Sequence, residues 1–201
     1  MASINYATKE INCKLVYYGP GMCGKTTNLQ YIHKQTSGNA RCGEMVSLAT
    51  PGERTLYFDF LPVQLTEVQG FKVKFGLYTV PGQVLYNATR KLVLRGADGI
   101  VFVADSQWNL MQENVDSLHN LKENLATYDI RLDNLPYAMQ YNKRDLPDIA
   151  PVWYLDYLLN PGGAPAFEAE AVNGPGVYET LSALCRYVIR DVVNRFEVGA
   201  L

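Results

Sequence analysis

The chain lacks the features that mark membrane-spanning, secreted or nucleic-acid-coating proteins. No run of about eighteen uncharged apolar residues occurs, and the first residues carry no basic stretch followed by an apolar one. Neither sign of charge dominates, because 18 Lys and Arg residues stand against 20 Asp and Glu residues. Any recognition of phosphate must therefore come from a local site rather than from a basic surface.

Cysteine is scarce, and the usual signals for lipid anchors are missing. The four cysteines, Cys13, Cys23, Cys42 and Cys185, show no C-x-x-C spacing, which favours a reducing cytoplasm over a disulfide framework. The chain has neither an N-terminal Met-Gly nor a C-terminal C-a-a-X box. We therefore expect a soluble protein without a transmembrane segment or lipid anchor, folded as one domain over residues 1–201.

Short apolar runs alternate with longer amphipathic segments, a pattern that predicts an α/β fold with a mostly parallel sheet flanked by helices. The apolar runs predict six principal strands, at residues 14–18, 56–61, 71–79, 99–105, 137–142 and 166–170. Apolar residues at three- and four-residue spacing predict helices at residues 25–35, 86–94, 110–128, 152–159 and 177–196.

Two segments break this alternation. Residues 62–70 are too few for a crossover helix, so the second and third strands should form one antiparallel pair. Residues 36–55 contain Gly, Ser, Asn and Pro with little periodicity. A long irregular loop inside a compact domain is typically functional.

A phosphate-binding loop is the strongest motif. The pattern Gly19-x-x-x-x-Gly24-Lys25-Thr26 follows an apolar strand and opens a helix, which disfavours an ordinary glycine-rich turn with an exposed lysine. Backbone N–H groups of such a loop surround phosphate oxygens. Lys25 should reach the β- and γ-phosphates, and the Thr26 hydroxyl should bind Mg²⁺. The expected nucleotide contacts are Gly19, Gly21, Met22, Cys23, Gly24, Lys25, Thr26 and Thr27.

Cys23 lies where the helix N-terminus and Lys25 could depress a thiol pKa, which raises the hypothesis of a redox-sensitive switch. The favoured interpretation is a small residue that fits the loop. Loss of nucleotide affinity on oxidation would separate the two.

The sequence Asn142-Lys143-Arg-Asp145 follows the strand at 137–142 and predicts a guanine reader at the carboxyl end of the sheet. The Asp145 carboxylate can accept from N1–H and the exocyclic amine of guanine, a pair of donors that adenine lacks. Asn142 can bond the other edge of the base, with Lys143 beside it. An ATP-dependent kinase is the competing interpretation, because Asp105 ends an apolar strand as a Walker B ligand would.

Together these motifs resemble the Ras-like small GTPases. Pro81-Gly82-Gln83 is similar to the switch II element, and Glu168-Ala-Glu-Ala171 is loosely similar to the loop whose backbone contacts guanine. Residues 3–195 more narrowly resemble the MglA-like family of prokaryotic Ras-like GTPases. The strings that carry this resemblance are Val16-Tyr-Tyr-Gly-Pro-Gly21, Gly43-Glu-Met-Val-Ser-Leu-Ala-Thr50, Glu53-Arg-Thr-Leu56, Phe58-Asp-Phe-Leu-Pro62, Tyr78-Thr-Val-Pro-Gly-Gln83, Val101-Phe-Val-Ala-Asp-Ser106 and Asn142-Lys-Arg-Asp-Leu-Pro147.

The resemblance implies a P-loop switch that binds GTP or GDP with Mg²⁺ and controls cell polarity and motility. It implies a cytoplasmic protein, monomeric on its own and open to recruitment to a cell pole. Its implied partners are effectors and a roadblock-domain activator of the MglB type, which stimulates a slow GTP hydrolysis; no nucleic acid is implied.

The resemblance also assigns catalytic and switch residues. Gln83 would orient the attacking water, Arg54 would act in cis as an arginine finger, and Lys25 would complete the catalytic set. Thr55 would close on Mg²⁺ and the γ-phosphate, sharing the metal with Thr26. Gly82 and Ala171 would contact the nucleotide through their backbones.

One position departs from the Ras pattern. Thr79 stands where switch II normally carries an aspartate that orients Mg²⁺, and the MglA-like family shares this threonine. A hydroxyl cannot supply the charge of a carboxylate, so we expect weak intrinsic hydrolysis, with the metal depending on Thr26, Thr55 and the phosphates. A nucleotide-binding module that has lost hydrolysis remains an alternative.

Overall fold

The computed structural model describes residues 2–36, 43–49, 55–82 and 86–198. The chain forms a sheet with the order β3-β4-β5-β2-β6-β7-β8, and β1 pairs with β2 beside this path. In chain order the elements are β1 (Ser3–Asn5), β2 (Glu10–Tyr18), α1 (Lys25–Thr36), β3 (Val46–Ala49), β4 (Thr55–Val68), β5 (Phe71–Thr79), α2 (Asn87–Leu94), β6 (Gly99–Asp105), η2 (Trp108–Leu110), α3 (Met111–Ala126), η3 (Leu132–Asn134), β7 (Tyr137–Asn142), α4 (Val152–Leu159), β8 (Ala166–Glu168) and α5 (Val177–Val198).

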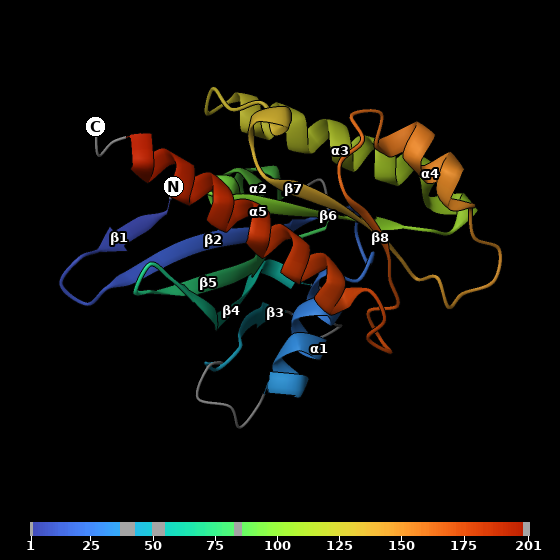
Figure 1. Cartoon of the computed structure of the whole chain (residues 1–201). Coiled ribbons are helices and arrows are strands. Elements are labelled where there is room, and N and C mark those ends of the chain that lie inside the picture. Colours follow the sequence, from blue (N-terminus) through green and yellow to red (C-terminus); the bar gives the residue numbers. More distant parts are fainter. Residues whose placement is uncertain (1, 37–42, 50–54, 83–85, 199–201) are drawn as a thin grey trace.

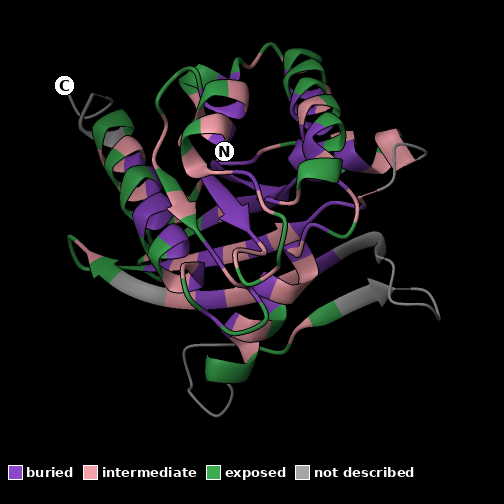
Figure 2. Cartoon of the chain, turned by 90° about the vertical axis from the view of Figure 1, so that its right-hand side faces the viewer, coloured by how far each residue is buried: buried purple, intermediate pink, exposed green. Residues whose placement is uncertain are grey.

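The sheet is the middle of three layers. Helices α1 and α5 cover one face, and α2, α3 and α4 cover the other (Figure 1). Each face has its own core, one centred on Leu15, Phe75 and Leu184 and the other on Phe102, Leu121 and Leu155. Figure 2 shows the result, with buried strands between helices whose outer faces are exposed. Strand β6 is buried along its whole length, as expected for a parallel strand covered on both sides.

The predicted antiparallel pair is confirmed, but its connection is shorter than expected. Strand β4 continues through Val68, so that only Gln69 and Gly70 join it to β5. Both turn residues have positive φ, 49° and 80°, as two-residue hairpin turns require. Pro62 lies inside β4, where its carbonyl accepts from the Gly43 N–H on the side away from β5. Its missing N–H therefore removes no bond from the β4–β5 ladder.

Two short strands that the sequence analysis does not predict, β1 and β3, bring the described sheet to eight strands. They add antiparallel pairs on β2 and β4, so antiparallel pairing extends beyond the single predicted pair. Strand β3 lies within the segment 36–55, which is expected to be irregular. The main predicted strands and helices are present with shifted ends; for example, the last strand stops at Glu168 and α5 reaches Val198.

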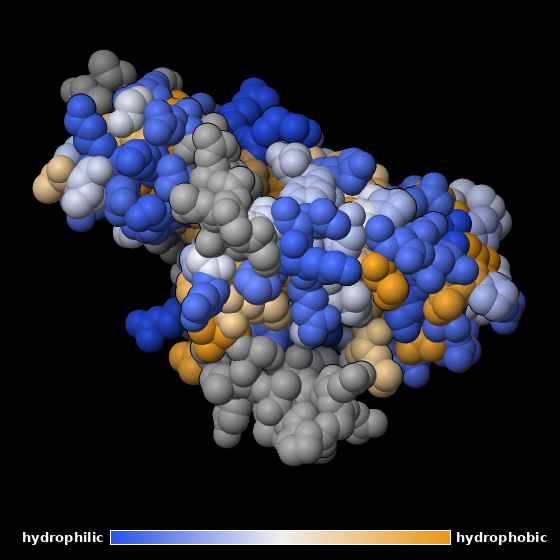
Figure 3. Space-filling model, turned by 90° about the horizontal axis from the view of Figure 1, so that it is seen from below, coloured by the Kyte–Doolittle hydropathy of each residue, from blue (hydrophilic) through white to orange (hydrophobic). Residues whose placement is uncertain are grey.

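Among the described residues, no helix combines the length and apolar character needed to cross a bilayer. The face seen from below in Figure 3 is mainly polar, with apolar side chains in small separate groups.

Candidate functional site

The loop after β2 lies at the point where the sheet reverses its winding. Strand β2 has β5 on one side and β6 on the other, and ligands of open α/β sheets bind at such a point. A Cβ on Gly19, whose φ is +150°, would lie 2.1 Å from the Val103 carbonyl oxygen. A Cβ on Gly24, with φ +101°, would lie 2.2 Å from the Asn142 amide nitrogen. Only glycine fits either position.

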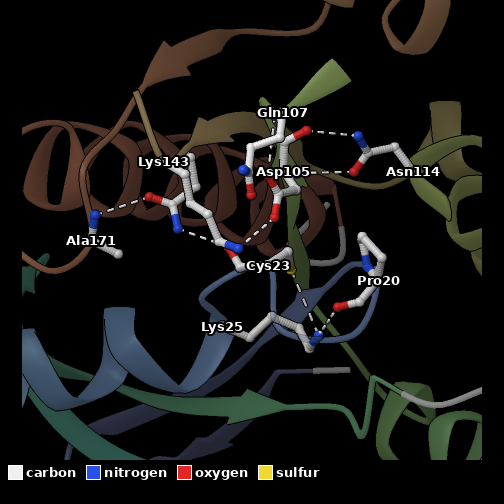
Figure 4. Close-up of polar contacts among 9 residues, drawn as sticks. Pro20, Cys23, Lys25, Asp105, Gln107, Asn114, Lys143 and Ala171 are labelled. Carbon is white, nitrogen blue, oxygen red and sulfur yellow. Dashed lines mark hydrogen bonds and ion pairs between the residues drawn. The ribbon is translucent and has the colours of Figure 1, made fainter. Parts of the chain in front are cut away.

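The Lys25 ammonium lies inside this loop. Its Nζ donates to the carbonyl oxygen of Gly19 at 3.0 Å. It also donates to the carbonyl oxygen of Pro20 at 2.5 Å and lies 3.7 Å from the Cys23 sulfur (Figure 4). Burial lowers the pKa of this lysine from its ordinary value. The loop therefore holds a desolvated cation among neutral acceptors, an arrangement in which an anion would be strongly attracted.

The Cys23 side chain is fully buried, and desolvation raises its thiol pKa. Lys25 lowers this pKa, but by less than burial raises it. This direction is opposite to the depressed pKa that a reactive thiol needs, so the structure disfavours the redox hypothesis. Cys13 and Cys185 are likewise buried free thiols. Met22, by contrast, is exposed at the tip of the loop, with φ 59°.

A carboxylate from a neighbouring strand reaches the predicted metal-binding threonine. Thr26 donates to Asp59 Oδ2 at 2.6 Å, and Thr79 donates to the same oxygen at 2.8 Å. The Asp59 N–H donates in return to the Thr79 hydroxyl at 2.9 Å. Asp59 and Thr79 are fully buried. A buried carboxylate from β4 thus bonds both Thr26 and Thr79, the position where the Ras pattern carries an aspartate.

Sequence reasoning misses Asp59 because it places the metal ligands in the loops and at the switch II position. A weak signal exists, since Asp59 stands inside an aromatic strand, between Phe58 and Phe60. A buried aspartate in such a strand needs polar partners, and these are residues of the predicted site.

The guanine-reader motif is tied directly to the phosphate-binding loop. Asn142 Nδ2 donates to the Cys23 carbonyl at 2.7 Å, and the Ala171 N–H donates to Asn142 Oδ1 at 2.9 Å. One amide therefore joins three segments that are far apart in sequence: the loop after β2, the end of β7 and the loop before α5. Sequence reasoning predicts that these segments meet, and the structure brings them together.

The next residue of the motif forms an ion pair with a buried carboxylate. Lys143 Nζ lies 2.6 Å from Asp105 Oδ2, and the Gln107 N–H donates to Asp105 Oδ1 at 3.1 Å (Figure 4). Asn114 fixes the Asp105 backbone by accepting from its N–H and donating to its carbonyl. Asp105 is thus committed to Lys143, whereas Thr26 takes its carboxylate from Asp59. This arrangement disfavours Asp105 as the metal ligand of a kinase.

Asp145 is exposed in the turn after β7, and its carboxylate is accessible. Beside it, Arg144 is anchored to Glu168 Oε2 at 2.9 Å and to the Ala150 carbonyl at 2.7 Å. The turn that carries Asp145 is therefore held at both sides.

The start of switch II packs against the phosphate-binding loop. A Cβ on Gly82 would lie 2.4 Å from the Gly21 Cα, so the two backbones are in direct contact. Arg90 of α2, which is buried, donates to the carbonyls of Pro81 and Gly82. Gln83 and Arg54 lie outside the described residues. Thr55 begins β4, but its side chain also lies outside what the structure describes.

The described residues fit a nucleoside triphosphate with Mg²⁺. The loop offers backbone space that a Cβ would fill and a buried ammonium, both suited to phosphate. Thr26 and Asp59 present oxygen atoms, which are the ligands that Mg²⁺ prefers. No group of three or more His, Cys, Asp or Glu suited to a metal occurs in the part of the chain that the structure describes, so an all-protein metal cage is not indicated there.

No protein-family model matches the chain. A curated relative does: over 192 residues the chain is 53% identical to the mutual gliding-motility protein MglA of Myxococcus xanthus (strain DK1622), covering 96% of this chain and 98% of the relative. The motifs and the fold agree with this similarity. The chain therefore belongs to the MglA family, and its fold is that of a Ras-like G domain.

Proposed function

We propose that this chain is a small GTPase that binds GTP and GDP with Mg²⁺ and hydrolyses GTP slowly until an activator binds. The observation that carries the proposal is the hydrogen-bonded chain from the Cys23 carbonyl through Asn142 to the Ala171 N–H. It joins the loop after β2, the end of β7 and the loop before α5, which supports a single nucleotide site formed by these segments. Residues 1–201 would act as a single G domain.

The base would be selected by Asp145, whose exposed carboxylate can accept from the two donors on one edge of guanine. Ala171 and Asn142 would bound the base on its other side, and Lys143 would line it while paired with Asp105. ATP offers no such donor pair, so equal competition by ATP and GTP would reverse the proposal.

The phosphates would lie in the loop of Gly19, Gly21, Met22, Cys23 and Gly24, with Thr27 beside them. Lys25 would exchange two neutral carbonyl acceptors for anionic phosphate oxygens, which form stronger bonds to an ammonium. This exchange supports binding that depends on phosphate rather than on the base alone.

Thr26 and Thr55 would hold Mg²⁺. Asp59 would orient the Thr26 hydroxyl by accepting its hydrogen bond. Bound Mg²⁺ would neutralise charge on the β- and γ-phosphates. The buried Asp59 carboxylate weighs against a module without hydrolysis, because it restores near Thr26 the negative charge absent at Thr79.

Hydrolysis would depend on positioning and on stabilisation of charge at the γ-phosphate. Gln83 would orient the water, with Gly82 presenting its backbone to the phosphate, and Arg54 would supply the cation in cis. An activator with a roadblock domain would align these groups. Effectors would then read the nucleotide state in a polarity or motility process, with the protein in the cytoplasm or recruited to a pole.

Phosphate release over many turnovers, with and without the activator, tests this function. We expect slow release alone and strong stimulation by the activator. Arg54→Ala should keep GTP binding and lose the stimulation by orders of magnitude. Tight GTP binding without phosphate release, both with and without the activator, would instead establish a nucleotide-binding module that has lost hydrolysis.

A further inference from the structure

A second polar connection lies beneath the site, inside the core between β7, α1 and α5. It consists of Asn28 on α1, Gln140 on β7 and Thr180 on α5, and all three side chains are fully buried. Polar side chains are costly in a core unless they are hydrogen-bonded. Their contacts therefore show what holds them there.

The two amides form a reciprocal pair. Asn28 Nδ2 donates to Gln140 Oε1 at 2.9 Å, and Gln140 Nε2 donates to Asn28 Oδ1 at 3.1 Å. Asn28 Nδ2 also donates to the Gly24 carbonyl at 2.9 Å. At the other end, Gln140 Nε2 donates to the Thr180 hydroxyl at 3.1 Å, which donates to the Gly176 carbonyl at 2.6 Å.

Every donor hydrogen of these three side chains has an acceptor. A carbonyl can only accept, so the Gly24 oxygen fixes the orientation of the Asn28 amide and the Gly176 oxygen fixes the direction of the Thr180 hydroxyl. The Gln140 amide then has one orientation that satisfies both neighbours. A fully satisfied network of this kind favours one arrangement of the segments that it connects.

These segments are the same three that Asn142 joins. Gly24 follows Cys23 in the phosphate loop, and Gln140 precedes Asn142 by two residues, which places both side chains on one face of β7. Gly176 ends the loop that contains Ala171. A Cβ on Gly176 would lie 2.0 Å from the Glu168 carbonyl oxygen, so this loop is packed tightly against the end of β8.

We propose that Asn28, Gln140 and Thr180 are positioning residues that hold the phosphate loop and the guanine-reading loop in register. This inference rests on the proposed function and deepens it, because it assigns retention of the nucleotide and discrimination of the base to a connection outside the proposed nucleotide contacts. Asn142 joins the segments at the proposed ligand site. Asn28, Gln140 and Thr180, the buried network, join the same segments within the core.

The test measures dissociation of a fluorescent GDP analogue, with Mg²⁺, into excess GDP. Asn28→Leu/Gln140→Leu replaces the amide pair by an apolar pair, which leaves no amide of the pair unsatisfied and spares much of the fold's stability. We expect dissociation about tenfold faster than in the wild type, because most changes of affinity at one binding site appear in the off-rate. Thr180→Val should give a smaller increase, and Thr180→Ser should restore the wild-type rate.

Inosine diphosphate provides the readout that a merely structural role would not change. It lacks the exocyclic amine, so the wild type should bind it more weakly than GDP. In the double variant the preference for GDP over inosine diphosphate should shrink, because the guanine-reader motif is no longer held in its position relative to the phosphate loop. Leu184→Ala, which opens a cavity in the same core but outside the buried network, is the matched control. It should lower the melting temperature without changing the preference.

The outcomes separate the two proposals. A folded double variant that keeps the wild-type dissociation rate and the GDP preference overturns the positioning role and leaves the GTPase untouched. If the double variant does not fold, Thr180→Val provides the test. An unchanged rate of GDP-analogue dissociation in this variant overturns the positioning role. A wild type that binds neither GDP nor GTP would remove the proposed function and this inference together.

Discussion

At the scale of single residues, the site depends on buried carboxylates whose neighbours satisfy them. Asp59 accepts from the hydroxyls of Thr26 and Thr79, and Lys143 pairs with Asp105. Removing one partner of such a pair costs more than removing both, because the remaining group stays buried without its bond. Single substitutions here should therefore have effects that are specific and large.

Asp59→Asn should weaken the binding of Mg²⁺ while leaving the protein folded. The amide keeps the shape but loses the charge that orients the Thr26 hydroxyl, so the Mg²⁺ concentration for half-maximal GDP retention should rise about 10- to 100-fold. Titration of Mg²⁺ against GDP dissociation measures this. Asp116→Asn, on the exposed face of α3, is the control and should leave the curve unchanged.

Cys23 should resist alkylation in the native protein. Its raised pKa means that, at any pH below that value, less thiolate is present than in an ordinary cysteine, and burial blocks the reagent as well. Iodoacetamide at pH 8, followed by peptide mass spectrometry, should find this residue unmodified until denaturant is added. Rapid labelling of Cys23 in the folded protein would revive the redox hypothesis.

At the scale of elements, two regions in which the backbone changes direction have a narrowly defined geometry. Switch II approaches the phosphate loop so closely that Gly82 and Gly21 touch, and the β4–β5 hairpin turns in two residues. Both regions depend on glycine for backbone reasons, not for flexibility. Substitutions in these regions should act by changing the backbone geometry. Their effects on nucleotide binding and on the free energy of unfolding can be measured separately.

Gly82→Ala should push switch II away from the phosphate loop. The new methyl group would meet the Gly21 backbone at 2.4 Å, and backbone atoms cannot rotate aside as a side chain can. We expect a loss of about 1–3 kcal/mol in stability from this overpacking and a lower preference for GTP over GDP. Denaturant unfolding and competition binding measure the two effects. Unchanged values in both would show that the contact is not maintained in solution.

In the hairpin, two substitutions should act with opposite signs. Gly70→Ala forces a side chain into φ +80°, which should destabilise the protein by about 1–2 kcal/mol although nothing lies within 4 Å of the new atom. Gln69→Asn creates the Asn-Gly pair that suits such turns and should stabilise it modestly. Urea unfolding of both variants checks the pair of signs. Equal midpoints would argue against this turn geometry.

The sequence predicts most elements because their signals are local. Glycine spacing after an apolar run locates the phosphate loop, and the motif at Asn142 locates the base end. Other features depend on neighbours in space. Proline usually ends a strand, yet Pro62 is tolerated because its nitrogen faces away from β5, and Asp59 becomes meaningful only beside Thr26. The short strand β3 exists through its pairing with β4, so its own residues carry little signal.

At the scale of the whole molecule, the sheet has two unlike halves. Strands β2, β6, β7 and β8 are parallel, and β6 and β7 are almost wholly buried. At the other edge, β3, β4 and β5 form antiparallel pairs, and β5 joins the two halves through its parallel pairing with β2. The proposed base contacts come from the parallel half. The proposed metal and switch contacts come largely from the antiparallel half and the loops around it.

Because the site joins both halves, bound nucleotide should stabilise the entire fold. Free GDP at about 1,000 times its dissociation constant should add about 4 kcal/mol, which corresponds to a rise of roughly 8–16 °C in Tm for a chain of this size. Differential scanning calorimetry with Mg²⁺ and GDP measures the rise, with ADP as the control. A rise with ADP as large as with GDP would argue against guanine selection.

The bond between Asn142 and Ala171 has a kinetic meaning as well. The amide is already held on both sides in the structure, so docking the base requires little rearrangement and little additional loss of conformational entropy. Capture should then be a single bimolecular step whose rate rises linearly with nucleotide concentration, without the plateau of a slow closure. Release would be the slow step, and a cell would control this protein by opening the site rather than by supplying nucleotide.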